Sequence, residues 1–261
     1  MDDYPQPGHW PTDPMNSTLS IDISQPWSAS TVAIKATPKS TSSGPIGLSD
    51  QAIWKDPSGN AFYIFGGRAP YSCNRDRIKK DGIWKFTADG KGGGSWTKEK
   101  PSNPVLLNTF TLTYGAAFAS SPDGVGFSIG GFAEPDTEPD LPKDYYHMIP
   151  RMLSYQMKSK TWSFSNTDMA VPPAGLLLNG RAEYVPAFGT NGLLFLMGGL
   201  VYDETQEGRQ KASHTLDFNN ITFYDPVDGK WRYQQTQGYA PTERQTFCMV
   251  GITSHNGTYE M

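Results

Sequence analysis

The side chains that could bind a metal ion or transfer protons are spread thinly along this 261-residue chain. Its four histidines, His9, His147, His214 and His255, lie in separate polar segments and show none of the spacings of metal sites. The densest group of carboxylates, in residues 132–148, lacks the Asp-x-Asp-x-Asp-Gly pattern of a calcium-binding loop. Nucleophile-elbow, Cys-x-x-Cys and phosphate-loop motifs are absent as well. We therefore expect no metal, no cofactor and no enzymatic activity.

Two further residue types bear on the environment of the protein. N-glycosylation sequons begin at Asn16, Asn220 and Asn256, which are therefore candidate glycan sites. Cys73 and Cys248 are too few for a disulfide framework. Because Cys248 lies in an apolar, strand-like run, we expect it to be a buried small side chain.

The bulk composition excludes several classes of protein. A net charge of -4 and a pI near 5.6 provide no basic field that would hold nucleic acid. No run of about 18 apolar residues could span a membrane, and the acidic, proline-rich start does not resemble a signal peptide. With 27 glycines, 21 prolines and 13% aromatic residues, the chain is typical of many short strands joined by turns.

An apolar run that ends in two glycines recurs three times and organises the chain. The pairs are Gly66–Gly67, Gly130–Gly131 and Gly198–Gly199, and their second glycines are 64 and 68 residues apart. Such a recurrence indicates repeated structural units. Each unit is expected to form four short strands, joined in turn by a tight turn, a long loop and a second tight turn.

Aromatic residues complete each unit behind its glycine pair. They are Trp84 and Trp96 in the first unit, Tyr155 and Trp162 in the second, and Tyr224 and Trp231 in the third. The last two pairs are seven residues apart, whereas the first is twelve apart because a glycine-rich turn lengthens it. Large rings fill the space between stacked sheets, which lie about 10 Å apart. We therefore expect these aromatic residues and the glycines to be structural.

A diglycine after an apolar strand, followed by a spaced aromatic residue and Trp, resembles the kelch repeat. The resemblance implies an all-β fold, because each kelch repeat is one four-stranded antiparallel blade of a β-propeller. It covers nearly all of residues 18–261. The segments 83–90 and 184–189 are also similar to kelch-repeat proteins of filamentous fungi, which are secreted or membrane-anchored. This narrower resemblance implies an extracellular or cell-surface location.

The resemblance further implies three full blades and two half blades. An extended lead-in occupies residues 1–17, and the propeller follows, with full blades at residues 51–98, 114–164 and 182–235 and half blades at residues 18–28 and 245–261. Kelch rings usually have more blades than this chain supplies. We therefore expect an incomplete ring, or a fragment of one, in preference to a closed four-bladed ring.

The long loops are the expected place for recognition. Strand direction alternates within a blade, so the tight turns fall on one side of the propeller and the long loops on the other. Long loops on one side of a rigid scaffold commonly carry binding residues. Candidate contact residues in these loops are Arg68, Arg75, Arg77, Asp136, Tyr145 and Tyr146.

Three functions follow from these expectations, in order of preference. The first is a non-enzymatic scaffold for a protein or cell-surface ligand, with no nucleic acid among its partners. The second is an intracellular kelch adaptor that works in a cytoplasmic complex. The third is a copper oxidase, because some kelch propellers such as galactose oxidase bind copper through Tyr and His. No matching Tyr and His set can be placed in this chain.

Overall fold

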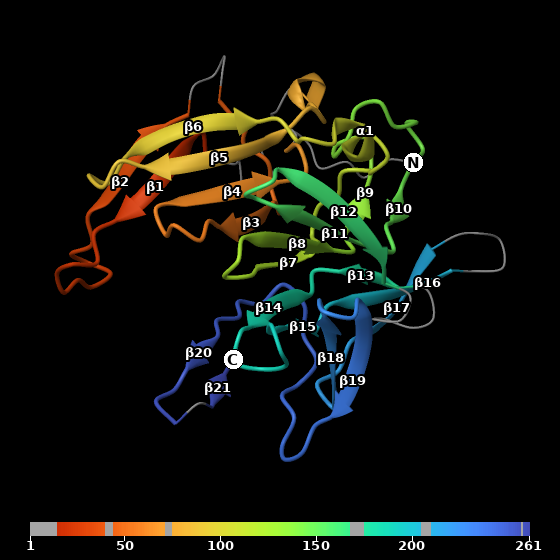
Figure 1. The fold of residues 1–261 in the computed structure, drawn as a ribbon. Coiled ribbons are helices and arrows are strands. Elements are labelled where there is room, and N and C mark those ends of the chain that lie inside the picture. Colours follow the sequence, from red (N-terminus) through yellow and green to blue (C-terminus); the bar gives the residue numbers. More distant parts are fainter. Residues whose placement is uncertain (1–14, 40–43, 71–74, 168–174, 205–209, 257) are drawn as a thin grey trace.

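The computed structural model describes residues 15–39, 44–70, 75–167, 175–204, 210–256 and 258–261. Nearly all regular structure in these residues is β-strand, so the fold is all-β, as the sequence predicted (Figure 1). The connections contain a short α-helix, α1 (Pro104–Leu107), and a 3-10 turn, η1 (Arg75–Arg77). Within the described residues, no helix is long and apolar enough to cross a membrane.

Three four-stranded antiparallel sheets form the body of the molecule. In each of them, every strand pairs with the strand that precedes it in that sheet. Sheet 1 consists of β3 (Ala52–Lys55), β4 (Ala61–Phe65), β5 (Ile83–Ala88) and β6 (Gly94–Glu99). Sheet 2 consists of β7 (Ala117–Ser120), β8 (Val125–Ile129), β11 (Arg151–Gln156) and β12 (Thr161–Asn166). Sheet 3 consists of β14 (Arg181–Val185), β15 (Leu193–Met197), β18 (Asn220–Asp225) and β19 (Lys230–Gln235).

Four smaller sheets flank this body. The hairpin β1 (Ser17–Ile21) and β2 (Ile34–Pro38) precedes sheet 1, and the hairpin β20 (Ile252–Thr253) and β21 (Tyr259–Glu260) follows sheet 3. Two more sheets arise in the long connections. They are the pair β9 (Phe132–Ala133) and β10 (His147–Met148), and the three-stranded sheet of β13 (Leu176–Leu178), β16 (Leu200–Glu204) and β17 (Gln210–Thr215).

Side-chain alternation and turn chemistry explain the short strands. In β3, Ala52 and Trp54 are buried whereas Ile53 and Lys55 are exposed, the period expected of a pleated strand. The turn that follows is fixed by Asp56, whose carboxylate accepts a hydrogen bond from the backbone amide of Ser58 at 2.9 Å. An aspartate that binds the backbone two residues later is a common way to begin a tight turn.

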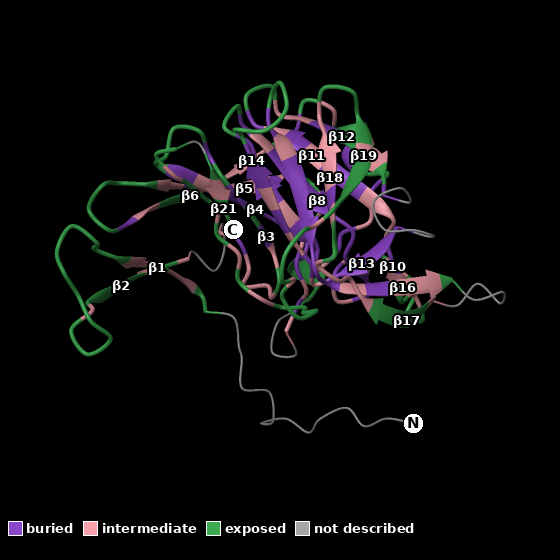
Figure 2. Ribbon diagram, turned by 90° about the horizontal axis from the view of Figure 1, so that it is seen from below, coloured by how far each residue is buried: buried purple, intermediate pink, exposed green. Residues whose placement is uncertain are grey.

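The three sheets pack face to face and follow one another along an arc. The first strands β3, β7 and β14 lie beside one another in this order. Between sheets 1 and 2, Trp54 stacks on Tyr155 at 6.4 Å and meets the ring of Trp162 at 6.0 Å. Between sheets 2 and 3, Phe127 stacks on Tyr184 at 6.1 Å. Figure 2 shows the resulting band of buried residues along strands of the sheets.

Two expectations from the sequence need correction. The first half blade was expected over residues 18–28, but β2 lies beyond residue 28 and pairs with β1 along its whole length, so the hairpin extends to Pro38. In the third unit a long loop was expected between the second and third strands, but β16 and β17 form a hairpin there. Most of β17 is polar and exposed, so its sequence lacks the alternation that marks a strand with one buried face.

Candidate functional site

The diglycines form the joints between successive units. The second glycine of each pair donates its amide hydrogen to a carbonyl of the following connection, namely Gly67 to Thr113 at 2.9 Å, Gly131 to Leu177 at 2.8 Å, and Gly199 to Arg244 at 2.9 Å. The first glycine faces the same carbonyl so closely that a Cβ atom would meet its oxygen at 2.5 to 2.6 Å. All six glycines also have positive φ. Only glycine combines this backbone conformation with this approach.

A second series of backbone bonds, which we call the connector ladder, links four residues with positive φ. These residues are Asp50, Gly115, Asn179 and Thr246, and each stands a few residues before the first strand of its unit. The amide of Gly115 donates to the carbonyl of Asp50, Asn179 donates to Gly115, and Thr246 donates to Asn179. The ladder therefore places Thr246 in register with the residues that precede the first strands of the three sheets.

The structure places the repeat aromatic residues between the sheets. Tyr155 and Trp162 are buried and face each other across β11 and β12, and the half-buried Tyr224 and Trp231 face each other across β18 and β19. In the first unit the expected partner was wrong. Trp96 lies opposite Phe86, and Trp84 lies opposite Lys98. Phe86 therefore occupies the position that Tyr155 and Tyr224 hold in the other sheets, and Trp84 lies two residues earlier in β5.

Arg68 joins the long loops of the first and second units. It forms an ion pair with Glu134 and a longer one, of 3.9 Å, with Asp136. Arg75 pairs with the other oxygen of Asp136 at 3.3 Å, and the amide of Ala69 donates to the Asp136 carbonyl at 2.8 Å. The structure thus brings three of the predicted contact residues together, but it uses their charges to hold two loops against each other.

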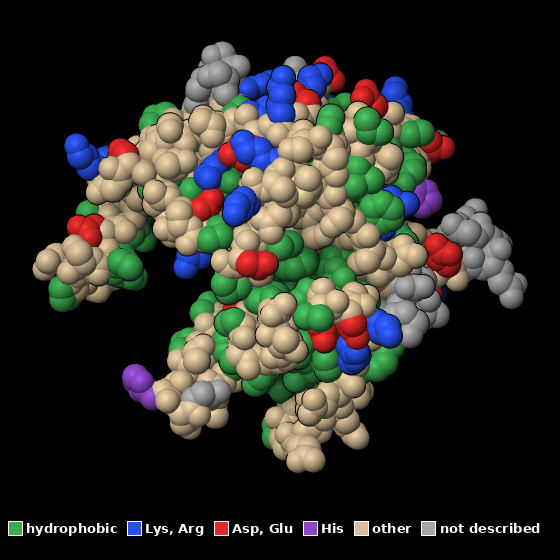
Figure 3. Space-filling view, viewed as in Figure 1, with side chains coloured by type: hydrophobic (Ala, Val, Ile, Leu, Met, Phe, Trp, Pro, Cys, Tyr) green, Lys and Arg blue, Asp and Glu red, His purple; other side chains and the backbone are tan. Residues whose placement is uncertain are grey.

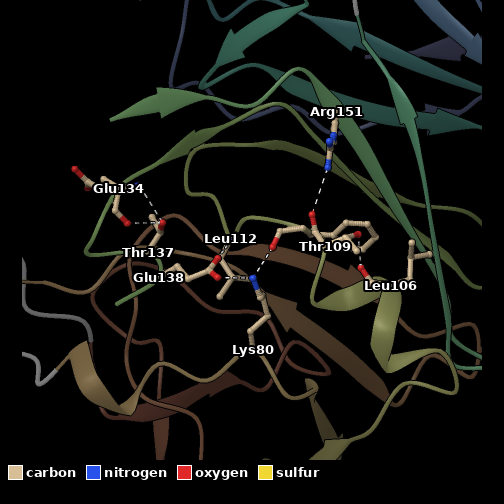
Figure 4. A network of polar contacts seen from close by, with 9 residues as sticks. Lys80, Leu106, Thr109, Leu112, Glu134, Thr137, Glu138 and Arg151 are labelled. Carbon is tan, nitrogen blue, oxygen red and sulfur yellow. Dashed lines mark hydrogen bonds and ion pairs between the residues drawn. The ribbon is translucent and has the colours of Figure 1, made fainter. Parts of the chain in front are cut away.

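Lys80 makes a second link between these loops (Figure 4). Its ammonium group donates to the carbonyl of Phe110 and to the carboxylate of Glu138, whose other oxygen accepts from the amide of Leu112 at 3.0 Å. A hydrogen-bonded ion pair of this kind holds its groups in one geometry. The loop of the first unit, the connection after it and the loop of the second unit therefore form one ordered surface.

The buried carboxylate of Glu134 is the most unusual ionisable group in this region. Burial raises its pKa, the charge of Arg68 opposes that rise, and the nearby Asp136 adds to it. The backbone of Glu134 is fixed by Thr137, whose hydroxyl donates to the Glu134 carbonyl at 2.8 Å (Figure 4). Among the described residues, no group of three or more His, Cys, Asp or Glu side chains could hold a metal ion.

The remaining candidate contact residues are Tyr145, Tyr146 and Arg77. Tyr145 is half-buried and packs edge-on against the ring of His147 at 4.5 Å, whereas Tyr146 is exposed. Arg77 is exposed in η1. The long-loop side of the molecule therefore presents aromatic and basic side chains on a backbone held by hydrogen bonds.

A groove of about 560 Å³ opens beside this surface. Apolar and basic side chains both line it, and they include Ile46, Leu48, Trp84, Leu112, Lys80 and Lys98. Lys98 lies 5.3 Å from the ring of Trp84 and pairs with Asp81. The groove therefore offers an aromatic side chain and a lysine whose charge is paired with a carboxylate.

The candidate glycan sites and the cysteines have separate surroundings. Asn16, Asn220 and Asn256 are all exposed. Cys248 is exposed, so the expectation that it is buried was wrong. Cys248 lies two residues after the ladder residue Thr246, just as Ala52 lies two residues after the ladder residue Asp50. Sheet 2 covers Ala52, which is buried. No described residue of a following sheet covers Cys248. Cys73 lies outside the described residues.

Two structural features were missed in the sequence. Trp54 has no counterpart at its position in the other units, so it did not enter the repeat pattern. The ladder residues differ in type, but two of them are Asp50 and Asn179, which tolerate positive φ better than other residues with a side chain. The ladder residues recur along the chain at nearly the same interval as the diglycines, and this interval could have identified them.

Comparisons with known proteins give little beyond these observations. No protein-family model matches the chain, and no curated protein matches it. The solved structure of YjhT is similar at 14% sequence identity and a TM-score of 0.46, over 84% of this chain. The chain spans about half (51%) of the length of that structure.

Proposed function

We propose that this chain is a kelch-type β-propeller scaffold that binds a protein or cell-surface ligand through its long-loop side and catalyses no reaction. The three four-stranded sheets and their diglycine joints support the propeller architecture. The long loops lie on one side of the sheets and the tight turns on the other, and this separation supports the long-loop side as the binding side. On the opposite side, tight turns gather, as the contact between Gly124 and Pro57 illustrates.

The observation that carries this proposal is the bonding between successive long loops. The ion pair of Arg68 with Glu134 and the bonds of Lys80 with Phe110 and Glu138 fix the loops before any ligand arrives. Preorganised loops lose less conformational entropy when they bind, which increases affinity. Exposed Tyr146 and Arg75 then provide aromatic and cationic contacts of the types enriched in protein interfaces.

The binding side can be tested by comparing matched substitutions. The labelled protein is applied to intact cells of the producing organism, and the bound amount is measured as a function of concentration. We expect Tyr146→Ala and Arg75→Ala to reduce saturable binding by about tenfold each, as contacts at the centre of an interface do. Val227→Ala, in an exposed turn on the opposite side, should leave binding unchanged. Equal binding by all three variants would contradict the proposal.

Two alternatives have their own measurements. Glycans on Asn220 or Asn256 of the protein from its native host would support the cell-surface location, and unmodified protein in the cytosol would favour an intracellular adaptor. Copper analysis of the purified protein addresses an oxidase. Stoichiometric copper would overturn the non-enzymatic scaffold.

A further inference from the structure

A pocket of about 650 Å³ lies between sheets 2 and 3 on the tight-turn side of the molecule. Turns of both sheets line it, and its lining includes Asp123, Val125, Phe127, Tyr184, Asn191 and Pro226. Figure 3 shows apolar side chains, in green, in the region between these two sheets. Binding sites for small ligands are commonly apolar hollows of this size with a few polar groups.

The same place between sheets 1 and 2 is closed by packing. There Gly124, directly before β8, lies so near Pro57 that a Cβ atom would meet its ring at 3.0 Å, and Met157 is buried. The glycine directly before β15 is Gly192, which lies against the ring of Tyr184 in its own sheet, where a Cβ atom would be 2.5 Å away. The turn before β15 therefore folds over its own sheet and leaves the space beside sheet 2 open.

Two rings of fixed position form the inner wall of the pocket. Tyr184 stacks on Phe127 with 6.1 Å between the ring centroids, and its hydroxyl donates a hydrogen bond to the carbonyl of Asn191. Both side chains are buried, so the packing between the sheets holds them in place. A wall that is fixed before binding loses little conformational entropy when a ligand packs on it.

Asp123 is the one charged side chain in the lining of the pocket. One of its carboxylate oxygens accepts a hydrogen bond from the hydroxyl of Ser121, which in turn accepts from the amide of Val125 at 3.0 Å. Within the part of the chain that the structure describes, no lysine or arginine pairs with Asp123, whereas the nearby Asp225 has Arg232 at 3.8 Å. The pocket therefore carries a negative charge without a cationic partner.

This negative charge reaches the aromatic wall. Burial raises the pKa of the Tyr184 phenol, and the charges of Asp123 and Asp225 raise it further. A field that disfavours an ionised phenol stabilises a positively charged ligand and repels an anionic one. The face of an aromatic ring also attracts an ammonium group. The surroundings thus suit a cation that is attached to an apolar body.

We propose that this pocket binds a small organic ammonium ion, with its charge at Asp123 and its apolar body against Tyr184, Val125 and Pro226. Hydrogen bonds in which both groups are charged are stronger than neutral ones, and this contact sets the orientation of the ligand. The pocket lies on the side opposite the long loops. Its occupation therefore goes beyond the proposed function, and either proposal can fail while the other holds.

The test compares two probes that share a ring and a chain length but differ in charge, phenethylammonium and phenethyl alcohol. Ligand-observed NMR with the purified protein measures both dissociation constants at about pH 7, where an aspartate is ionised. We expect saturable binding of phenethylammonium that is about tenfold tighter than binding of the alcohol, the typical contribution of a hydrogen bond to a charged group. Absence of saturable phenethylammonium binding, or equal binding of the two probes, overturns the proposal.

Matched substitutions locate the binding. Asp123→Asn removes the charge but keeps an oxygen that accepts from Ser121, so the turn stays intact and only phenethylammonium should bind about tenfold more weakly. Asp140→Asn removes an exposed carboxylate from the long loop of the second unit and should change neither affinity. Val125→Phe fills part of the pocket and should weaken both probes, and circular dichroism checks that each variant is folded. Equal phenethylammonium affinities of the two aspartate variants, or unchanged binding by a folded Val125→Phe, contradict the assigned site.

Discussion

The indole nitrogen of Trp54 donates a hydrogen bond of 2.9 Å to the backbone carbonyl of Phe127, across the interface between sheets 1 and 2. Space for the ring comes from Gly126, where a Cβ atom would lie 2.2 Å from the indole. The position that Gly126 holds in sheet 2 is held by Phe62 in sheet 1 and by Leu194 in sheet 3. A large residue in one sheet and a glycine in the next therefore form one packing unit.

Trp54→Phe tests the polar part of this contact. The substitution removes the donor to Phe127 and some apolar volume, so we expect a loss of about 3 kcal/mol in the free energy of unfolding. Urea denaturation followed by circular dichroism measures it. Trp27→Phe is the matched control, because Trp27 is 53% exposed and should change stability by less than about 0.5 kcal/mol. Equal effects of the two substitutions would show that the indole bond contributes nothing.

The diglycine joints predict a difference between two glycines that share positive φ. Gly59 has φ of 77° and open space around its Cα, whereas Gly66 has φ of 66° and the Thr113 carbonyl oxygen 2.5 Å from a Cβ position. Gly59→Ala should cost about 1–2 kcal/mol from backbone strain alone. Gly66→Ala should cost at least about 3 kcal/mol, because a backbone clash adds to that strain.

Unfolding curves for the two variants, measured side by side, check this difference. A variant equivalent to Gly66→Ala at the second joint is Gly130→Ala, where the Leu177 carbonyl oxygen lies 2.6 Å from the Cβ position. If Gly66→Ala and Gly59→Ala are equally stable, the close approach seen at the joint is not a constraint on the sequence.

Local patterns predicted the strands of the repeated units, but contacts between residues far apart in the sequence determined the strand register and the packing between sheets. The diglycines located the ends of β4, β8 and β15, because their conformation requires glycine. The partner of Trp96 was misplaced, since a lengthened turn hides the register that pairs it with Phe86. Similarly, nothing near Trp54 in the sequence points to Gly126, because the space it fills lies in another sheet.

The candidate site was predicted only in part, again because contacts between residues far apart in the sequence form it. Loop lengths indicated which segments carry Arg68, Arg75 and Asp136, and charge indicated that they would be polar. The sequence could not show that Arg68 and Asp136 pair with each other, because that contact depends on how two successive units pack. Burial of Glu134 followed from the same packing.

The turn after β3 predicts a loss of stability in acid. The carboxylate of Asp56 is buried, which by itself raises its pKa, but hydrogen bonds from Lys85 and Ser58 outweigh burial and lower the pKa to about 2. A depressed pKa stabilises the folded state above the unfolded value of 3.8, and this contribution disappears as the pH falls through about 2. Asp56→Asn should therefore cost roughly 2 kcal/mol at pH 7 and much less at pH 2.

Stability measured against pH for the unaltered protein and Asp56→Asn checks this prediction. The two curves should converge between about pH 4 and pH 2. Asp228→Asn is the control, because Asp228 pairs with Arg232 in an exposed turn where solvent screens the charges. Its effect should be smaller and should fall with added salt. Parallel curves for Asp56→Asn would contradict the assigned role of the carboxylate.

The connector ladder predicts a stabilising substitution. Thr246 has φ of 54°, a conformation unfavourable for a β-branched residue, whereas Asn179 holds the same ladder position with φ of 58°. Thr246→Asn should therefore raise the free energy of unfolding by about 0.5–1 kcal/mol, since Asn tolerates this region better. Asn179→Thr is the reciprocal change and should lower stability by a similar amount, because it places a β-branched residue at positive φ. Denaturation of both variants decides the point, and a stabilising Asn179→Thr would show that backbone strain at the ladder does not control stability.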